Sequence, residues 1–218
     1  FFFEKKDVRS VMGALVYLVK TRLPEYIGAS PFEIQVLTPM RKGELGVEHL
    51  NEVLQYYLNP ASESKKEKEG RTGVFREGDK VMQVKNNYKL EWKITNAKGF
   101  SIEEGLGVFN GDMGIIKQIN TYSERITVVF DENREAEYPF SSLDELELAY
   151  AITIHKSQGS EYPAVVLPLL SGPPILCNRN LLYTAITRAQ KCVAIAGRQS
   201  MVEQMIHNET EQKRYSGL

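Results

Sequence analysis

The chain has 218 residues, of which 42% are hydrophobic and 25% are charged, as expected for a globular protein of one or two domains. The net charge of −1 gives no protein-wide field for nucleic acid, so any such surface must be a local patch. Because no apolar run approaches the ~20 residues of a membrane span and two cysteines are too few for a disulfide framework, we expect a cytoplasmic chain without a membrane partner, with reduced thiols at Cys177 and Cys192.

The N-terminal third of the chain has the pattern of an α/β unit. Asp7 can cap a helix that runs to about Arg22, with apolar residues at helical spacing, and Pro24 is expected to end it. An apolar run at 34–37 predicts a buried strand, and the spacing of apolar residues at 46–58 predicts a second helix.

The pattern changes after the charged loop at 61–73, which has few apolar residues and marks a boundary. Short strands separated by turn residues follow, at 80–84, 114–119, 125–130 and 135–138. Several short strands with turns between them predict a small β-barrel.

The α/β pattern then returns. Strands are expected at 149–152, 164–167 and 193–196. A helix capped by Asn178 or Asn180 should run to about Lys191, and Ser200 should cap a last short helix. We therefore predict an α/β fold with a parallel-sheet domain formed by residues 1–72 and 148–218, interrupted by a β-barrel at 73–147.

Residues 153–161 (TIHKSQGSE) form a polar loop directly after a predicted strand. In open α/β sheets, ligands bind beyond the carboxyl ends of strands, and Gly159 permits close approach to a ligand. The alternative is a polar turn without a ligand. His155 in this loop is not expected to bind a metal, because the other two histidines, His49 and His207, do not form a metal-ligand spacing with it.

Two further segments have features of ligand contacts. Arg188 lies in the segment 182–189 (LYTAITRA), whose other side is apolar, so its charge could face a ligand or simply be solvated. The loop 37–46 (LTPMRKGELG) follows a strand, and the backbone amides of 42–46 could meet a phosphate at a helix N-terminus. A plain strand-to-helix loop is the alternative.

In the predicted barrel, lysines recur every four or five residues among the aromatic residues Tyr88 and Trp92. These lysines are Lys80, Lys85, Lys89, Lys93 and Lys98. Cations interleaved with aromatic rings suit single-stranded nucleic acid. A solvated, lysine-rich strand edge that prevents aggregation fits the pattern equally well.

Taken in order, the Thr-Pro-Met loop, the barrel insertion, the 153–161 loop and the Arg188 segment resemble the RecD-like group of superfamily 1 helicases, also called the exodeoxyribonuclease V alpha-chain family. The last two resemble helicase motifs V and VI. The resemblance implies a RecA-like second motor domain with an inserted Src-homology-3-like barrel, from a 5′→3′ DNA helicase of DNA repair and recombination.

The resemblance also implies roles for individual residues. Arg188 would be the arginine finger on the γ-phosphate, and the ATP-binding residues would be Arg188, Gly159, Glu161 and Arg41. The DNA-binding residues would be Thr38, Thr153, His155, Lys156, Ser157, Tyr88 and Trp92.

No G-x-x-x-x-G-K-[ST] phosphate loop occurs in the 218 residues. The resemblance therefore implies that ATP with Mg²⁺ is bound mainly by a first motor domain outside this sequence, and that the chain alone is inactive. The expected partners are single-stranded DNA, that N-terminal motor domain and other subunits of a repair complex. The alternative is a non-catalytic nucleic-acid-binding or scaffold domain of a repair nuclease complex.

Overall fold

The computed structural model describes residues 1–71, 73–96 and 99–209, and it separates into two compact units. Unit 1 comprises Phe1–Leu50 and Ala151–Leu218, and unit 2 comprises Asn51–Tyr150. The chain therefore passes from the first unit to the second inside a helix and returns directly before a strand.

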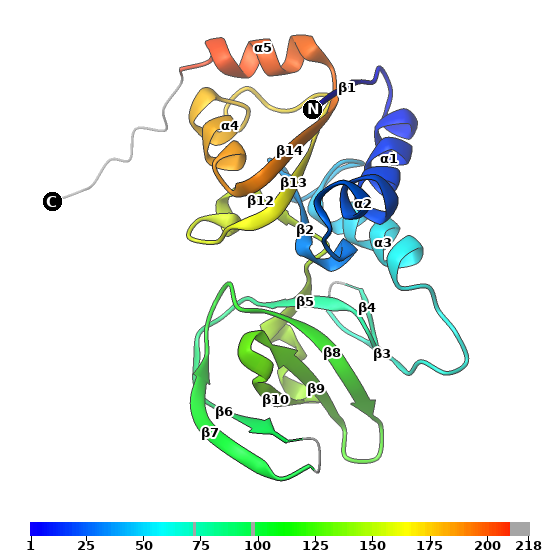
Figure 1. Cartoon of the computed structure of the whole chain (residues 1–218), viewed down its shortest axis with the longest axis vertical. Helices are drawn as coiled ribbons and strands as arrows, with labels where there is room; N and C mark the ends of the chain where they lie inside the picture. Colours follow the sequence, from blue (N-terminus) through cyan, green and yellow to red (C-terminus); the bar gives the residue numbers. More distant parts are fainter. Residues whose placement is uncertain (72, 97–98, 210–218) are drawn as a thin grey trace, which may run out of the picture. The chain divides into compact units, whose positions relative to one another are not determined.

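Unit 1 is built on a parallel sheet of five strands in the order β1-β14-β13-β2-β12 (Figure 1). The strands are β1 (Phe2–Glu4), β2 (Ile34–Thr38), β12 (Ala151–Thr153), β13 (Tyr162–Leu169) and β14 (Ala189–Gly197). The residues of β2 are all buried, as expected where helices cover both faces of a parallel sheet. In Figure 1, α1 and α2 lie on one side of this sheet and α4 on the other. The predicted α/β fold with a parallel sheet is confirmed.

The first helix begins as predicted but does not end as predicted. In α1 (Val8–Tyr17), the Asp7 carboxylate accepts a hydrogen bond from the Ser10 amide at 2.9 Å. A π-helical turn (Leu18–Arg22) follows, and then α2 (Leu23–Ile27). Pro24 lies in the first turn of α2, where a residue without an N–H is tolerated, so it does not end the helix. The end comes at Gly28, whose φ of +67° is left-handed.

The C-terminal helices differ from the prediction at their ends. The helix α4 (Arg179–Ile186) begins at Asn178, whose side chain accepts from the Leu181 amide at 2.9 Å. It stops well before Lys191 because β14 already begins at Ala189, so Arg188 lies between helix and strand. The helix α5 (Gln199–His207) has Arg198 at its N-cap, so the predicted Ser200 cap is wrong.

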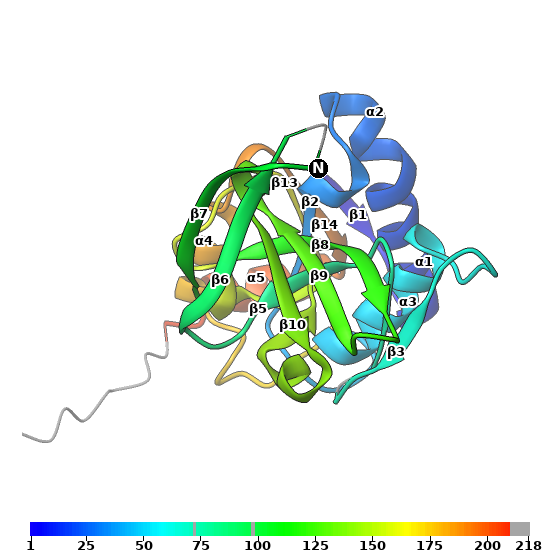
Figure 2. The same cartoon turned by 90° about the horizontal axis from the view of Figure 1, so that it is seen from below.

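Unit 2 is a curled antiparallel sheet of seven strands in the order β11-β5-β8-β9-β10-β6-β7, with a separate hairpin β3-β4. The strands are β3 (Glu67–Glu69), β4 (Val74–Arg76), β5 (Lys80–Gln83), β6 (Asn87–Thr95), β7 (Ser101–Val108), β8 (Met113–Asn120), β9 (Arg125–Phe130), β10 (Glu135–Pro139) and β11 (Leu146–Leu148). Figure 2 shows β6 and β7 as a long curved ribbon beside β8, β9 and β10.

Four strands of unit 2 match the predicted ones. The short strands β3, β4 and β11 were not predicted, and neither were the long strands β6 and β7. Their residues are mostly exposed or half-buried, so they lack the apolar runs that mark a buried strand. The strand predicted at 149–152 begins later than expected, as Ala151–Thr153, which pairs with β2 in unit 1. The preceding strand Leu146–Leu148 pairs with β5 in unit 2.

A buried carboxylate explains why residues 51–72 group with unit 2. Asp79 is fully buried, and its oxygens accept hydrogen bonds from Asn59 Nδ2, Gln55 Nε2, the Arg76 amide and Tyr150 Oη, at 2.7, 2.6, 2.7 and 2.9 Å. Gln55 belongs to α3 (Val47–Leu58), the helix predicted at 46–58. Asp79 thus joins the segment that enters unit 2 to Tyr150, the residue at which the chain leaves it.

Candidate functional site

The predicted ligand-binding residues of unit 1 lie at two opposite edges of its sheet, which are the carboxyl edge, where the strands end, and the amino edge, where they begin. Thr38 and Thr153 are register partners at the carboxyl ends of β2 and β12. Arg188 precedes β14, and Tyr162 pairs with Ala189 where β13 and β14 begin. Because all five strands are parallel, the start of one strand and the end of another lie at opposite edges. Residues 154–161 therefore run from the carboxyl edge to the amino edge.

This crossing segment is shaped by its own polar side chains. Thr153 caps a 3₁₀ turn (Ile154–Ser157), since its hydroxyl accepts from the Lys156 amide at 3.4 Å. Ser157 is fully buried, and its hydroxyl donates to the Ile154 carbonyl at 2.6 Å. Gly159 then turns the chain with a φ of +87°, in the left-handed region where glycine has no steric cost.

The side chains of this segment differ in how far they are accessible to a ligand. His155 is exposed, and Thr153 and Lys156 are half-buried, so each can reach a ligand at the carboxyl edge. The Ser157 hydroxyl is buried and holds the 3₁₀ turn through its bond to Ile154. The DNA contact of Ser157 stays a prediction.

Thr38 has a similar internal role. Its side chain is fully buried, and its hydroxyl donates to the Leu45 carbonyl at 2.7 Å. The amides of Gly46, Val47 and Glu48 donate to carbonyls of the same loop. The DNA contact of Thr38 stays a prediction, while among the amides expected to meet a phosphate, that of Gly46 already donates within the loop.

Arg41 lies in the same loop, on the outside. Its guanidinium forms an ion pair with Glu48 at 3.4 Å, and both side chains are more than 40% exposed. An ion pair this exposed contributes little to stability, so Arg41 can leave Glu48 for another anion at small cost.

Arg188 is held by neutral oxygens. Its Nη1 donates to the Ser160 carbonyl at 3.1 Å, its Nε to the Thr184 carbonyl at 3.3 Å, and its Nη2 to the Thr187 hydroxyl at 3.3 Å. Among the residues that the structure describes, Arg188 forms no ion pair, and its side chain is half-exposed. The protein thus fixes the direction of this charge without neutralising it. Ser160 belongs to the crossing segment, so the two predicted motifs are in contact.

The amino edge near Arg188 contains two other notable groups. Glu161 is exposed and accepts from Gln190 Nε2 at 3.3 Å. Tyr162 is buried, and burial raises the pKa of its hydroxyl, while the Ser160 side chain and the Arg188 charge act to lower that pKa. The site therefore places a cation, an exposed carboxylate and a buried hydroxyl around one turn of chain.

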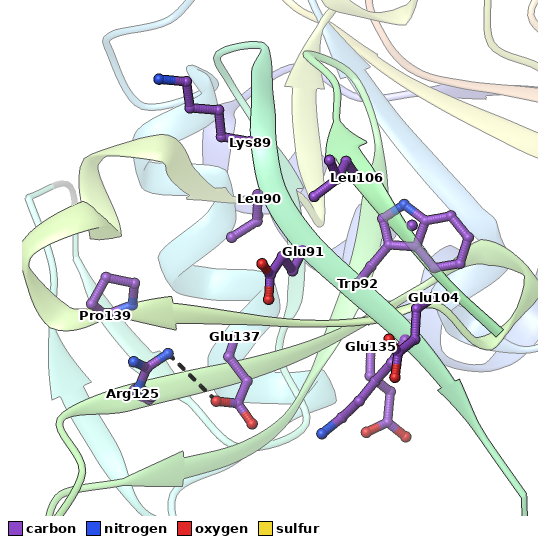
Figure 3. A pocket seen from close by; sticks show the side chains of 12 residues that line it. Lys89, Leu90, Glu91, Trp92, Glu104, Leu106, Arg125, Glu135, Glu137 and Pro139 are labelled. Atoms are coloured by element: carbon purple, nitrogen blue, oxygen red, sulfur yellow. Dashed lines mark ion pairs between the residues drawn. The ribbon is translucent and has the colours of Figure 1, made fainter. Parts of the chain in front are cut away.

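The aromatic residues of unit 2 are in different surroundings. Tyr88 is 68% exposed and packs edge-on against Phe109. Trp92 is half-buried, lies over Gly105, and has the Arg134 guanidinium 5.6 Å from its ring. Figure 3 shows Trp92 at a groove of 660 Å³. A ring already covered on one face is a poorer stacking platform than Tyr88.

Charges around this groove are mixed. It is lined by Lys89, Leu90, Glu91, Trp92, Lys93, Glu104, Gly105, Leu106, Arg125, Glu135, Glu137 and Pro139. Arg125 pairs with Glu137 at 3.5 Å, drawn as a dashed line in Figure 3, and Lys117 pairs with Glu135 at 2.6 Å. The predicted lysine row is incomplete at the surface, because Lys80 is buried and Lys85 pairs with Asp144. Lys98 lies outside the described residues.

Two basic residues at the carboxyl edge of unit 1 were missed by sequence reasoning. Lys6 follows β1 and Arg198 follows β14, so both lie at the carboxyl edge, and both are exposed. Placing Phe1–Phe3 in the sheet beside the last strand would have identified Lys6.

Two other predictions concern buried thiols and metal ligands. Cys177 and Cys192 are free and buried, and burial raises the pKa of both thiols. In the described part of the chain, no three His, Cys, Asp or Glu side chains are grouped as metal ligands. No helix in the same part is long and apolar enough to cross a membrane.

Comparison with known proteins gives two family matches. Residues 50–130 match the model of the "ATP-dependent RecD-like DNA helicase SH3 domain", and residues 148–196 match the "UvrD-like helicase C-terminal domain". These ranges contain most of unit 2 and the crossing segment with Arg188, respectively.

The individual proteins that are similar to this chain are also named as helicases or as RecD subunits. The chain is 39% identical over 167 residues to the ATP-dependent RecD2 DNA helicase of Deinococcus radiodurans, covering 77% of this chain and 20% of the relative. It is 30% identical over 186 residues to the RecBCD enzyme subunit RecD of Mycolicibacterium smegmatis, covering 85% and 28%. A solved Pif1 helicase from Bacteroides, in complex with ADP-AlF3 and single-stranded DNA, is 20% identical with a TM-score of 0.49, covering 88% and 46%.

The chain thus spans between a fifth and about a quarter of the length of these two curated relatives. The two models match in the order SH3 domain and then helicase C-terminal domain, within one chain. The chain belongs to the RecD-like family of superfamily 1 helicases.

Proposed function

We propose that this chain is the second motor domain, with its barrel insertion, of an ATP-dependent 5′→3′ DNA helicase. The observation that carries the proposal is the crossing segment, residues 154–161. It follows Thr153 on the carboxyl edge, and near its other end the Ser160 carbonyl accepts a hydrogen bond from Arg188 on the amino edge. A movement of Arg188 therefore acts on the same short segment that presents His155.

Arg188 suits the role of arginine finger. ATP supplies a γ-phosphoryl group whose transfer builds negative charge, and a planar guanidinium stabilises such charge through paired N–H donors. The neutral oxygens around Arg188 fit this ligand, because its charge has no carboxylate partner among the described residues. Gly159 and Glu161 would border the nucleotide from the crossing segment, and Arg41 is an ATP-side prediction without further support. ATP with Mg²⁺ would be held mainly by a first motor domain, so we expect this chain alone to be inactive.

The carboxyl edge suits single-stranded DNA. Basic side chains follow four of the five strands, and in sheet order they are Lys6, Arg198, Lys42 and Lys156. Five strands span about 19 Å, which is long enough for several phosphates of an extended strand. Exposed His155 and half-buried Thr153 lie at one end of this row. The row supports backbone contacts, which bind without reading sequence.

Two arginines at opposite ends of β14 provide a matched test in the full-length protein. With Arg188→Ala, we expect nucleotide binding to stay near normal while DNA-stimulated ATP turnover falls by about 10³-fold or more. With Arg198→Ala, we expect weaker binding of single-stranded DNA and a salt dependence reduced by about one phosphate contact, with turnover retained at saturating DNA. Unchanged turnover for Arg188→Ala would exclude the proposed function.

A second candidate is a non-catalytic scaffold in a repair nuclease complex. It is favoured by the relatives named as RecD subunits of the RecBCD enzyme. A scaffold would retain complex assembly when Arg188 is replaced, and it would show no DNA-stimulated turnover in the unaltered full-length protein. Measuring ATP turnover and strand separation with that protein decides between the two.

A further inference from the structure

The backbone of Arg188 is fixed on both sides. The helix α4 ends at Ile186 with Thr187 as its C-cap, and the Arg188 amide donates to the Ala185 carbonyl at 3.3 Å. The Arg188 carbonyl accepts from the Tyr162 amide at 2.8 Å, at the start of β13. Because the backbone is held in this way, the direction of the guanidinium depends on the groups around the side chain.

Two of the three oxygens that hold the guanidinium are backbone carbonyls, and the third is the hydroxyl of Thr187. This hydroxyl accepts from Arg188 Nη2 at 3.3 Å and donates to the Thr184 carbonyl at 3.0 Å. The same carbonyl accepts from Arg188 Nε at 3.3 Å. A hydroxyl can donate once and accept at the same time, so the two bonds of Thr187 are compatible. The Nε and Nη2 atoms of Arg188 are therefore held by two oxygens that are hydrogen-bonded to each other.

This arrangement leaves part of the guanidinium for a ligand. An arginine side chain carries five N–H groups, and the described residues engage one each at Nε, Nη1 and Nη2. The N–H groups that remain are enough for bidentate binding of a phosphate. A rotation of the guanidinium would break its bonds to Thr184 and Thr187 together. The Thr187 hydroxyl thus limits the directions in which the remaining N–H groups can point.

The exposure of Thr187 argues against a purely structural reason for its hydroxyl. The side chain is exposed at the end of a helix, where water can replace it as a donor to the Thr184 carbonyl. The Thr184 hydroxyl is used differently, because it donates to the Asn180 carbonyl at 2.8 Å within α4. Of these two threonine hydroxyls, the one that contacts Arg188 is therefore the one that the helix needs less.

We propose that Thr187 is a positioning residue for Arg188, whose hydroxyl holds the guanidinium so that its remaining N–H groups meet the γ-phosphate of ATP. Thr187 acts through Arg188 and does not touch the nucleotide. This inference rests on the proposed function, because it requires Arg188 to act on a phosphate.

Thr187→Val in the full-length protein tests the inference, since it removes the hydroxyl and keeps the branched shape. We expect the kcat of DNA-stimulated ATP turnover to fall about two- to tenfold, as for the loss of one hydrogen bond, with unchanged KM for ATP and unchanged Tm. Thr187→Ser keeps a hydroxyl and should retain kcat. Thr95→Val is the matched control, because the Thr95 hydroxyl also forms a 3.3 Å hydrogen bond, to Glu135 in unit 2. Its kcat should equal that of the unaltered protein.

A double variant shows whether the hydroxyl acts through the arginine. Residues that work as one unit have non-additive effects. Thr187→Val should therefore cause no further loss of turnover in a protein that already carries Arg188→Ala.

Four results would overturn the inference. They are an unchanged kcat in Thr187→Val, an equal fall of kcat in Thr187→Ser, a Tm that falls together with kcat, and the same loss of turnover when Arg188 is already replaced. Arg188→Ala alone separates this failure from that of the proposed function. Lost turnover in Arg188→Ala with normal turnover in Thr187→Val rejects only the role of Thr187, whereas normal turnover in Arg188→Ala rejects the function as well.

Discussion

The two polar clusters of the molecule are built in opposite ways. In unit 2, the carboxylate of Asp79 is fully buried and accepts four hydrogen bonds, although burial raises its pKa. In unit 1, Arg188 is half-exposed, and among the described residues it is held only by neutral oxygens. A satisfied cluster stabilises one arrangement of the chain. An unsatisfied cluster leaves groups free to change partners, which is what a ligand site requires.

The largest effect is expected from a substitution that breaks the hydrogen bonds of the buried Asp79 carboxylate. Asp79→Asn replaces one acceptor oxygen by an NH₂ group that faces donors, so we expect a loss of about 3–5 kcal/mol in the stability of unit 2. Hydrogen exchange of residues 51–150, measured in the full-length protein, should show faster exchange throughout this unit.

Asp144→Asn is the matched control for Asp79→Asn. Asp144 is an exposed carboxylate that pairs with Lys85, and we expect its replacement to leave the stability of unit 2 almost unchanged. Equal protection in the two variants would show that the Asp79 cluster does not hold unit 2 together.

A smaller effect is expected from replacing either of two aromatic residues of unit 2, which differ in exposure. Tyr88 is 68% exposed, whereas Trp92 is covered by Gly105 and Arg134. If the barrel stacks bases, Tyr88→Ala should weaken the binding of single-stranded DNA by about 1–3 kcal/mol. Trp92→Ala should instead lower the Tm. Fluorescence anisotropy with a labelled oligonucleotide measures the first effect.

Tyr122→Ala provides the control for exposure alone. Tyr122 is fully exposed in the turn between β8 and β9. An equal loss of affinity in Tyr88→Ala and Tyr122→Ala would indicate a general loss of aromatic surface. Unchanged affinity in Tyr88→Ala would remove base stacking from the functions of the barrel.

The sequence predicted the elements whose signal is local. Asp7 and Asn178 cap helices as expected, and the buried strands β2, β13 and β14 follow from their apolar runs. It did not predict β6 and β7, because exposed strands lack an apolar pattern.

For the site, the sequence identified the right segments but not the direction of each side chain. Thr38 and Ser157 are polar residues at strand ends, yet their hydroxyls bond to the carbonyls of Leu45 and Ile154. The position of Arg188 depends on Ser160, 28 residues away in the chain. A contact of that range is set by strand register, which a single sequence does not show.

The smallest expected effect concerns the turn that ends the crossing segment. Gly159 has a φ of +87°, and an added Cβ would meet no atom within 4 Å, so Gly159→Ala introduces backbone strain without a clash. We expect a loss of about 1 kcal/mol. If this turn transmits the movement of Arg188, DNA-stimulated turnover should fall while ATP binding is kept. Gly13→Ala is the control, because Gly13 also has open space but lies in α1, where alanine is expected to raise the Tm. A Gly159→Ala protein that loses stability and keeps full turnover would show that the crossing segment does not couple the two edges of the sheet.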